Sequence, residues 1–235
     1  MKNTVLLMLA FFALSCSGNR GAMSSNTQPG KETLLFDGKT LNGWHAYNKT
    51  GPIKNWIIED GVLVCLGHAQ GDVGGDIVTD AEYANFEFSW EWKLNTGGNS
   101  GVMYHVVEDP QYPGPYETGP EYQMIDDVTF PYKLEEWQQT GADYAMTVPN
   151  AQKKLMPVGE WNSSKIVFDK GHVEHWLNGI KILEFQAWTP EWEKMKREGK
   201  WKEYPDYGSA KTGRIALQDH ESKVYFRNIR IRELR

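Results

Sequence analysis

The sequence predicts an all-β protein of the sandwich type, and three observations support this fold class. Short segments alternate apolar and polar side chains, as half-buried strands do. Turns rich in Gly, Asn and Asp separate these segments. No part of the pattern alternates strands with long helices, as a parallel βα fold would. The 235 residues suit one domain of this kind.

The clearest strand is predicted over residues 85–94 (NFEFSWEWKL). Aromatic and leucine side chains occupy every second position, and polar side chains lie between them. One face of this strand should therefore pack on a core while the other faces solvent. The same alternation predicts strands over 56–58, 62–66, 101–107, 122–125, 164–168, 172–177, 181–186, 213–217 and 224–232.

Hairpin turns are indicated between several of these strands. Asp60-Gly61 and Asn178-Gly179 place a glycine where the chain must adopt a positive φ, and Asp169-Lys170-Gly171 is a third such signal. Many short strands joined by tight turns are typical of a sandwich or barrel.

One short helical insertion interrupts the strands. Thr189 is a good N-cap, and Pro190 suits the first helical position. Glutamates come early in the segment and basic residues late, which complements the helix dipole. Gly199 should end the helix, which we expect to pack on an edge of the sandwich.

The N-terminus has the layout of an export signal. A basic start precedes an apolar run that is too short to span a bilayer, and Cys16 follows it in a pattern that resembles a bacterial lipobox. We predict a signal peptide over 1–15, a lipid-anchored flexible tether over 16–33 and a folded domain over 34–235. The protein would then be a periplasmic or outer-membrane-anchored lipoprotein, with plain secretion as the alternative.

The composition limits the classes of molecule that the protein is expected to bind. The net charge of −6 argues against nucleic acid and anionic lipid, so we expect membrane contact only through the N-terminal anchor. Cys65 would be the folded domain's one cysteine, which excludes an internal disulfide. The 10 tryptophans indicate cores or stacking surfaces, and Trp137, Trp161 and Trp201 are candidate platforms for a sugar ring.

Seven segments, in order, resemble one known family. They are 35–44 (LFDGKTLNGW), 56–61 (WIIEDG), 99–102 (NSGV), 121–126 (EYQMID), 175–179 (HWLNG), 216–220 (ALQDH) and 226–231 (FRNIRI). The chain is similar to the 3-keto-disaccharide hydrolase family, also described as 3-keto-glucoside 1,2-lyase and 3-keto-2-hydroxyglucal hydratase. The resemblance implies a concanavalin A-like jelly roll that acts on a carbohydrate. The sequence departs from the family at Glu221, where Gly is common, and at Tyr104-His105, where many members place Arg.

Sheet alternation suggests which polar residues share a face. Glu121 and Gln123 alternate with apolar neighbours, and so do Gln218 and His220. By the same alternation, His105 lies on the face opposite Tyr104. We therefore expect Glu121, Gln123, His105, Gln218 and His220 to line one polar surface, although a solvated sheet face would show the same pattern.

The resemblance implies cleavage of 3-keto-glycosides by removal of the C2 proton, elimination of the aglycone and addition of water. Three residues are predicted to be catalytic, namely His105, Glu121 and His220. Six are predicted to bind substrate, namely Asn99, Ser100, Tyr104, Gln123, Asp126 and Gln218. These residue types would also suit a divalent metal, but no metal-binding spacing is present and no cofactor is assigned.

Two alternatives remain open at this point. The same fold supports a carbohydrate-binding module without catalysis, because a fold alone does not determine function. An ordinary β-glucanase is a weaker alternative, since the sequence lacks the Glu-x-Asp-x-x-Glu strand motif of such enzymes.

Overall fold

The central strand β6 (Phe86–Leu94) shows the predicted alternation. The computed structural model describes residues 30–67 and 75–235, so the predicted signal peptide and Cys16 lie outside the described residues. Every second side chain of β6, from Phe86 to Leu94, is buried. Burying a large apolar side chain stabilises a fold by about 1.5–3 kcal/mol. This strand therefore contributes much of the core, as its sequence predicts.

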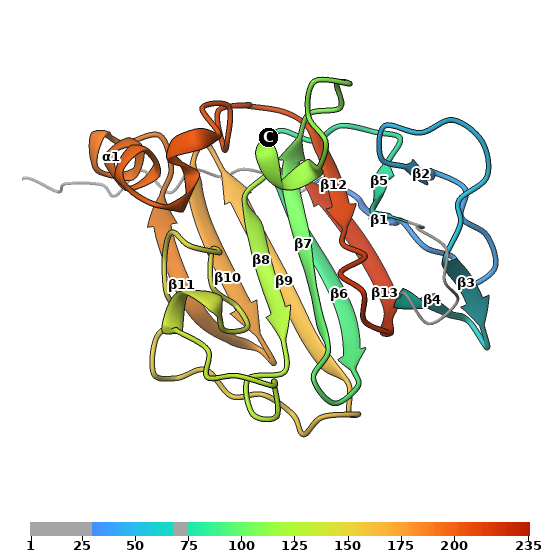
Figure 1. Ribbon diagram of the computed structural model, residues 1–235. Coiled ribbons are helices and arrows are strands. Elements are labelled where there is room, and N and C mark those ends of the chain that lie inside the picture. Colours follow the sequence, from blue (N-terminus) through green and yellow to red (C-terminus); the bar gives the residue numbers. More distant parts are fainter. Residues whose placement is uncertain (1–29, 68–74) are drawn as a thin grey trace, which may run out of the picture.

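Two antiparallel sheets form the sandwich (Figure 1). Across the larger sheet the strands are β11 (Ile180–Gln186), β10 (His172–Leu177), β9 (Asn162–Asp169), β6, β13 (Val224–Glu233), β4 (Val62–Cys65) and β3 (Trp56–Glu59), with β1 (Glu32–Leu34) paired to β13. Across the smaller sheet they are β2 (Trp44–Ala46), β5 (Ile77–Thr79), β12 (Arg214–Leu217), β7 (Asn99–Val106) and β8 (Glu121–Ile125). The fold is the predicted jelly-roll sandwich.

Aromatic side chains join the two sheets. The ring of Trp90 in β6 meets the ring of Tyr122 in β8 edge-on, with centroids 5.0 Å apart. Trp90 Nε1 also donates a hydrogen bond to Met124 Sδ at 3.3 Å. Tyr122 and Met124 thus face the core, which turns their neighbours Glu121 and Gln123 to the opposite face of β8.

The helical insertion is the helix α1 (Pro190–Glu198), beside the end of β11 in Figure 1. The Thr189 hydroxyl accepts a hydrogen bond from the Trp192 backbone N–H at 3.1 Å, as expected for an N-cap. The 3₁₀ helices η2 (Pro115–Glu117), η3 (Glu136–Gln138) and η4 (Lys200–Glu203) were not predicted. The ring of Trp201 in η4 stacks on Tyr207 with centroids 4.0 Å apart, and this contact anchors η4.

The strand boundaries differ from the prediction in a few places. Residues 32–34 form β1, so the folded part includes residues that the sequence assigned to the tether. The three-residue strands β2 and β5 were missed because so short a segment shows little alternation. In the part of the chain that the structure describes, no helix has the length and apolarity that crossing a bilayer requires.

Candidate active site

A cavity of about 420 Å³ opens on the outer face of the smaller sheet. Its walls come from β7, β8, the residue before β5, the segment after β12, the loop after η3 and the segments around η2 and η4. The residues that line it are Asp76, Asn99, Tyr116, Glu121, Gln123, Tyr144, Lys200, Trp201, Tyr204, Gln218, Asp219 and His220.

The side chain of Glu121 in β8 extends over the neighbouring strand β7. Gly101 of β7 pairs with Gln123 of β8, and a Cβ at Gly101 would overlap Glu121 Oε1. The absence of a side chain at residue 101 therefore lets the Glu121 carboxyl reach over β7. Glu121 is only 5% exposed. Burial raises its pKa to about 8, while the charge of Lys200 opposes the rise.

A pair of carboxyl groups, Asp76 and Asp219, lies on another side of the cavity. The Asp219 backbone N–H donates to Asp76 Oδ1 at 2.7 Å. Asp219 Oδ2 in turn accepts from Asn55 Nδ2 at 2.8 Å and from the Gly75 N–H at 3.1 Å. Burial raises the pKa of Asp76 to about 7, partly offset by the Asp219 hydrogen bond. The cavity thus has two carboxyl groups that change charge near neutral pH.

Three acceptor oxygens of cavity residues have no donor among the described residues. They are Asn99 Oδ1, Gln218 Oε1 and Asp219 Oδ1. Ser100 supports this wall from behind, because its hydroxyl donates to the Gln218 carbonyl at 2.8 Å. Unpaired polar atoms carry a desolvation cost, which hydroxyl donors of a ligand would offset.

Aromatic rings form another side of the cavity. Tyr204 meets Tyr116 and Trp201 edge-on, at centroid distances of 5.8 and 5.9 Å. Tyr144 meets Trp201 at 6.3 Å. We call these four residues the aromatic wall. One wall is aromatic and the facing groups are polar, an arrangement that suits a sugar with its C–H faces and hydroxyls.

The prediction that His105 shares the face of Glu121 is wrong. Arg214 pairs with Val106 while Ala216 pairs with Met103, so β7 carries one extra residue at this point. His105 takes a φ of 53° in this bulge, and its side chain turns to the core side. There Nε2 donates to the Ala84 carbonyl at 2.9 Å, and burial lowers the pKa of the imidazole to about 4.

Tyr104 and Asp126 also lie away from the cavity, contrary to prediction. Tyr104 is fully buried in the core, as the regular alternation before the bulge requires. Asp126 shapes the turn after β8, where its carboxylate accepts hydrogen bonds from the backbone N–H groups of Gly97, Val128 and Thr129. Its role in the structure is that of a turn residue.

Five of the nine predicted site residues line the cavity, namely Asn99, Glu121, Gln123, Gln218 and His220. Ser100 supports the wall, and His105, Tyr104 and Asp126 lie elsewhere. The roles assigned to the five stay predictions. Of the three candidate tryptophans, Trp201 lines the cavity, Trp137 contacts Tyr144, and Trp161 is covered by Arg227 at 4.0 Å.

Besides Asp219, the sequence did not indicate five polar or aromatic groups of the site, namely Asp76, Tyr116, Tyr144, Lys200 and Tyr204. They lie in loops or a 3₁₀ helix, where no period shows which way a side chain points. Asp219 lies within the 216–220 motif, but strand alternation predicts that its side chain points away from the face of Gln218. The strand ends at Leu217, so alternation no longer applies there.

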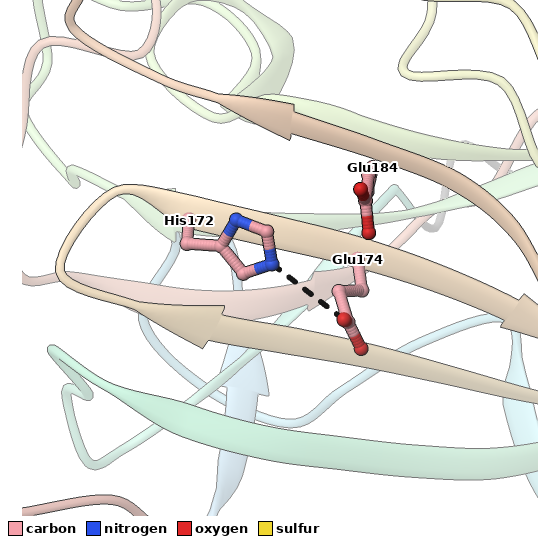
Figure 2. A group of neighbouring side chains, drawn as sticks. All are labelled: His172, Glu174 and Glu184. Atoms are coloured by element: carbon pink, nitrogen blue, oxygen red, sulfur yellow. Dashed lines mark ion pairs between the residues drawn. The ribbon is translucent and has the colours of Figure 1, made fainter. Parts of the chain in front are cut away.

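A group of metal-binding side chains lies on the larger sheet, away from the cavity. Ligand atoms of His172, Glu174 and Glu184 lie within 4.8 Å of one another and could hold a metal (Figure 2). His172 Nε2 is 3.5 Å from Glu174 Oε1. The Lys181 ammonium already forms ion pairs with both glutamates. No metal is established at this group, and none of its members lines the cavity.

Comparison with known proteins assigns the family. Residues 31–232 match the model of the 3-keto-alpha-glucoside-1,2-lyase-like domain. The chain belongs to this family. It is 35% identical to a 3-keto-disaccharide hydrolase of Bacteroides thetaiotaomicron, over 85% of this chain and 77% of that protein.

Solved structures agree with this family and with the fold. A candidate glycosyl hydrolase from Parabacteroides distasonis is 47% identical, with a TM-score of 0.81 over 87% of this chain and 94% of that one. A Bacillus subtilis protein with a galectin-like fold is 16% identical, with a TM-score of 0.50 over 87% of this chain and 98% of its own. The latter likeness concerns the fold alone.

Proposed function

We propose that this member of the family cleaves 3-keto-glycosides by elimination. The ketone at C3 acidifies the C2 proton, because its removal forms an enolate. When the C3 carbonyl re-forms, a C1–C2 double bond forms and the C1–O bond to the aglycone breaks. Water then adds across the double bond, with hydroxyl at C1 and hydrogen at C2, which completes a net hydrolysis.

The observation that carries this proposal is one cavity with two carboxyl groups that titrate near neutrality. Glu121 and Asp76 have pKa values of about 8 and 7, so each can exchange a proton at physiological pH. We assign Glu121 as the base that takes the C2 proton and Asp76 as the acid that protonates the leaving oxygen. His220, at the exposed rim of the cavity, is the alternative acid.

The remaining walls suit the rest of such a substrate. Asn99, Gln218 and Asp219 offer acceptor oxygens to sugar hydroxyls, and the aromatic wall offers ring faces to pyranose C–H groups. This route needs no oxocarbenium ion, and so does not require the carboxylate spacing of ordinary glycosidases.

The test is to incubate the purified protein with 3-keto-trehalose or 3-keto-sucrose and to measure the hexose released. Unoxidised trehalose and sucrose are the controls and should stay intact. The rate should follow a bell-shaped pH profile with limbs near 7 and 8, and Glu121→Gln should lower kcat by at least about 100-fold.

Retention of the sugars on an affinity column without turnover would instead identify a binding module. Release of sugar from unoxidised β-glucans would identify a glucanase. Either result would contradict the proposal.

A further inference from the structure

The proposed elimination creates a negative charge that the acid and the base do not stabilise. Removal of the C2 proton places the electron pair in a C2–C3 double bond and moves the carbonyl electrons to the C3 oxygen. In a cavity already lined by Asp76, Glu121 and Asp219, this enolate oxygen needs a positive partner. Oriented donors or cations at a developing oxyanion are often the largest single contribution to catalysis.

Lys200 is the one lysine or arginine among the residues that line the cavity. It begins η4, directly after the helix α1 and Gly199. Its Nζ lies 4.1 Å from the centroid of the Tyr144 ring, 5.5 Å from that of Trp201 and 6.0 Å from that of Trp137. Its charge reaches Glu121, since it holds the pKa of that carboxyl below the value burial alone would give.

Neighbouring lysines differ in being paired with carboxylates. Lys196 Nζ lies 3.2 Å from Glu193, Lys194 lies 3.9 Å from Glu198, and Lys202 lies 4.0 Å from Glu203. Within residues 30–67 and 75–235, no carboxylate lies within 4.0 Å of Lys200 Nζ. Aromatic faces hold an ammonium in place without neutralising it, so this charge stays available to a ligand.

We propose that Lys200 is a catalytic residue whose ammonium group donates a hydrogen bond to the C3 oxygen of the substrate. The inference rests on the proposed function. Lys200 polarises the ketone, Glu121 takes the C2 proton, and the enolate oxygen is held by the ammonium until the carbonyl re-forms. The C1–O electron pair leaves with the aglycone, which takes a proton from the acid, so the step needs no oxidant or reductant.

The experiment compares Lys200→Met, Lys200→Arg and the matched control Lys202→Met in the full chain. Lys202 is the next lysine of η4 and does not line the cavity. With 3-keto-trehalose, Lys200→Met should lower kcat by about 100-fold or more while KM changes less than about threefold. Lys200→Arg should recover part of the loss, and Lys202→Met should behave as wild type.

Two further readouts separate chemistry from structure. In D₂O, wild type should exchange deuterium into C2 of the ketosugar, and Lys200→Met should lose this exchange together with turnover. Its residual activity should also show the alkaline limb of the pH profile at higher pH. Of the charged groups facing Glu121, Asp76 and Asp143 would remain, while the positive charge that lowers its pKa would be gone.

Two outcomes would overturn the inference. One is a Lys200→Met variant that keeps kcat within threefold of wild type. The other is loss of wild-type activity on chelation with recovery on adding a divalent metal, because the metal would then be the electrophile. If the wild-type protein shows no turnover, the proposed function itself is overturned. The wild-type assay comes first, so this failure is distinguished from failure of the Lys200 inference. Equal thermal unfolding of the three variants checks that their folds are intact.

Discussion

At the scale of single residues, the position of the Glu121 carboxyl depends on what residue 101 lacks. Gly101 has no Cβ, and the carboxyl occupies the space that a Cβ would need. Inside a close-packed sheet, an added methyl group cannot be accommodated without moving a neighbour. The Asn-Ser-Gly segment therefore acts on the site through its glycine as well as through its polar side chains.

Gly101→Ala should displace the Glu121 side chain and lower kcat by roughly 10- to 100-fold. A misplacement of about 1 Å of a reacting group can cost about 100-fold. The cost in stability should stay near 1–3 kcal/mol, the usual range for overpacking. Steady-state kinetics and thermal unfolding of the variant check both values. Wild-type kcat in a folded Gly101→Ala protein would show that Glu121 need not lie over β7.

Glu121 should also weaken the fold as the pH rises. Its folded pKa of about 8 exceeds the ordinary glutamate value, so the folded state binds more protons between these two values. The contribution of this proton binding to the free energy of unfolding is full below the ordinary glutamate pKa and is lost as the pH rises through about 8. The glutamine of Glu121→Gln does not titrate. The unfolding free energy of this variant should therefore rise relative to that of wild type between pH 5 and 8, by an amount on the order of a few kcal/mol.

Asp126→Asn provides a control of opposite sign. Burial opposes its ionisation, but hydrogen bonds from Thr129, Gly97 and Val128 hold the pKa of Asp126 below its ordinary value. This stabilisation is present above the ordinary pKa and is lost as the pH falls through the folded value. Denaturant unfolding across pH should therefore show Asp126→Asn less stable than wild type at pH 7, with a smaller difference in acid. pH trends of the same sign in the two variants would contradict one of the two pKa assignments.

At the scale of elements, a bulge in β7 and the short helix η4 decide which side chains reach the cavity. The extra residue of the bulge turns His105 inward, where its ring lies 4.3 Å from that of Phe168. The Trp201 ring stacks on Tyr207 and its Nε1 donates to the Tyr144 carbonyl, which anchors η4 where Lys200 and Tyr204 line the cavity. The bulge arises from the pairing of β7 with β12, which is far away in the sequence, and the 3.1 Å hydrogen bond from Trp201 Nε1 likewise reaches the distant Tyr144 carbonyl.

His105→Gln should affect stability and leave the chemistry unchanged. The variant loses the packing of a buried ring against Phe168, which should cost about 1–3 kcal/mol of unfolding free energy. The activity per folded molecule should stay within about twofold of wild type. Unchanged stability combined with a large fall in kcat would show that His105 takes part in catalysis.

Tyr204→Ala should weaken substrate binding more than catalysis. Tyr204 lines the cavity and supports Tyr116 and Trp201, so its removal opens the aromatic wall. Loss of about 1 kcal/mol of aromatic contact corresponds to about a fivefold rise in KM, with kcat nearly constant. The control is Tyr132→Ala, an exposed tyrosine outside the cavity. An equal effect in both variants would show that the aromatic wall does not contact the substrate.

At the scale of the whole molecule, the cavity exists because residues far apart in sequence meet on one face of the smaller sheet. Glu121 comes from β8, Asp76 directly precedes β5, and Lys200 comes from the segment between β11 and β12. Strand pairing places β5, β12, β7 and β8 side by side. The jelly-roll topology thus brings together segments whose sequences do not show that they are neighbours in space.

The N-terminal sequence predicts a lipid anchor for this domain. Expressed in a bacterium, the wild-type chain should take up radiolabelled palmitate and fractionate with membranes. Cys16→Ser should lose both properties, because a thiol is needed at the predicted attachment site. Cys65→Ala is the control and should keep the label, since Cys65 is buried in the core. Soluble, unlabelled wild-type protein would instead support plain secretion.

The sequence by itself determined the sandwich class, the core face of β6, the capped helix α1 and the pairing of Glu121 with Gln123 on one face of β8. These features depend on local periods and caps, which are visible along a single segment. The ordered motifs also indicated the family, because they cover nearly the whole folded domain.

Only the tertiary structure decided that His105 leaves the site while Asp76, Lys200 and Tyr204 join it. The physical reason is that a bulge is defined by two paired strands, since it is a mismatch in their register. A loop or 3₁₀ helix likewise has no period that shows where its side chains point. Their positions follow from tertiary contacts, such as the hydrogen bond from Trp201 Nε1 to the Tyr144 carbonyl, between residues that are far apart in the sequence.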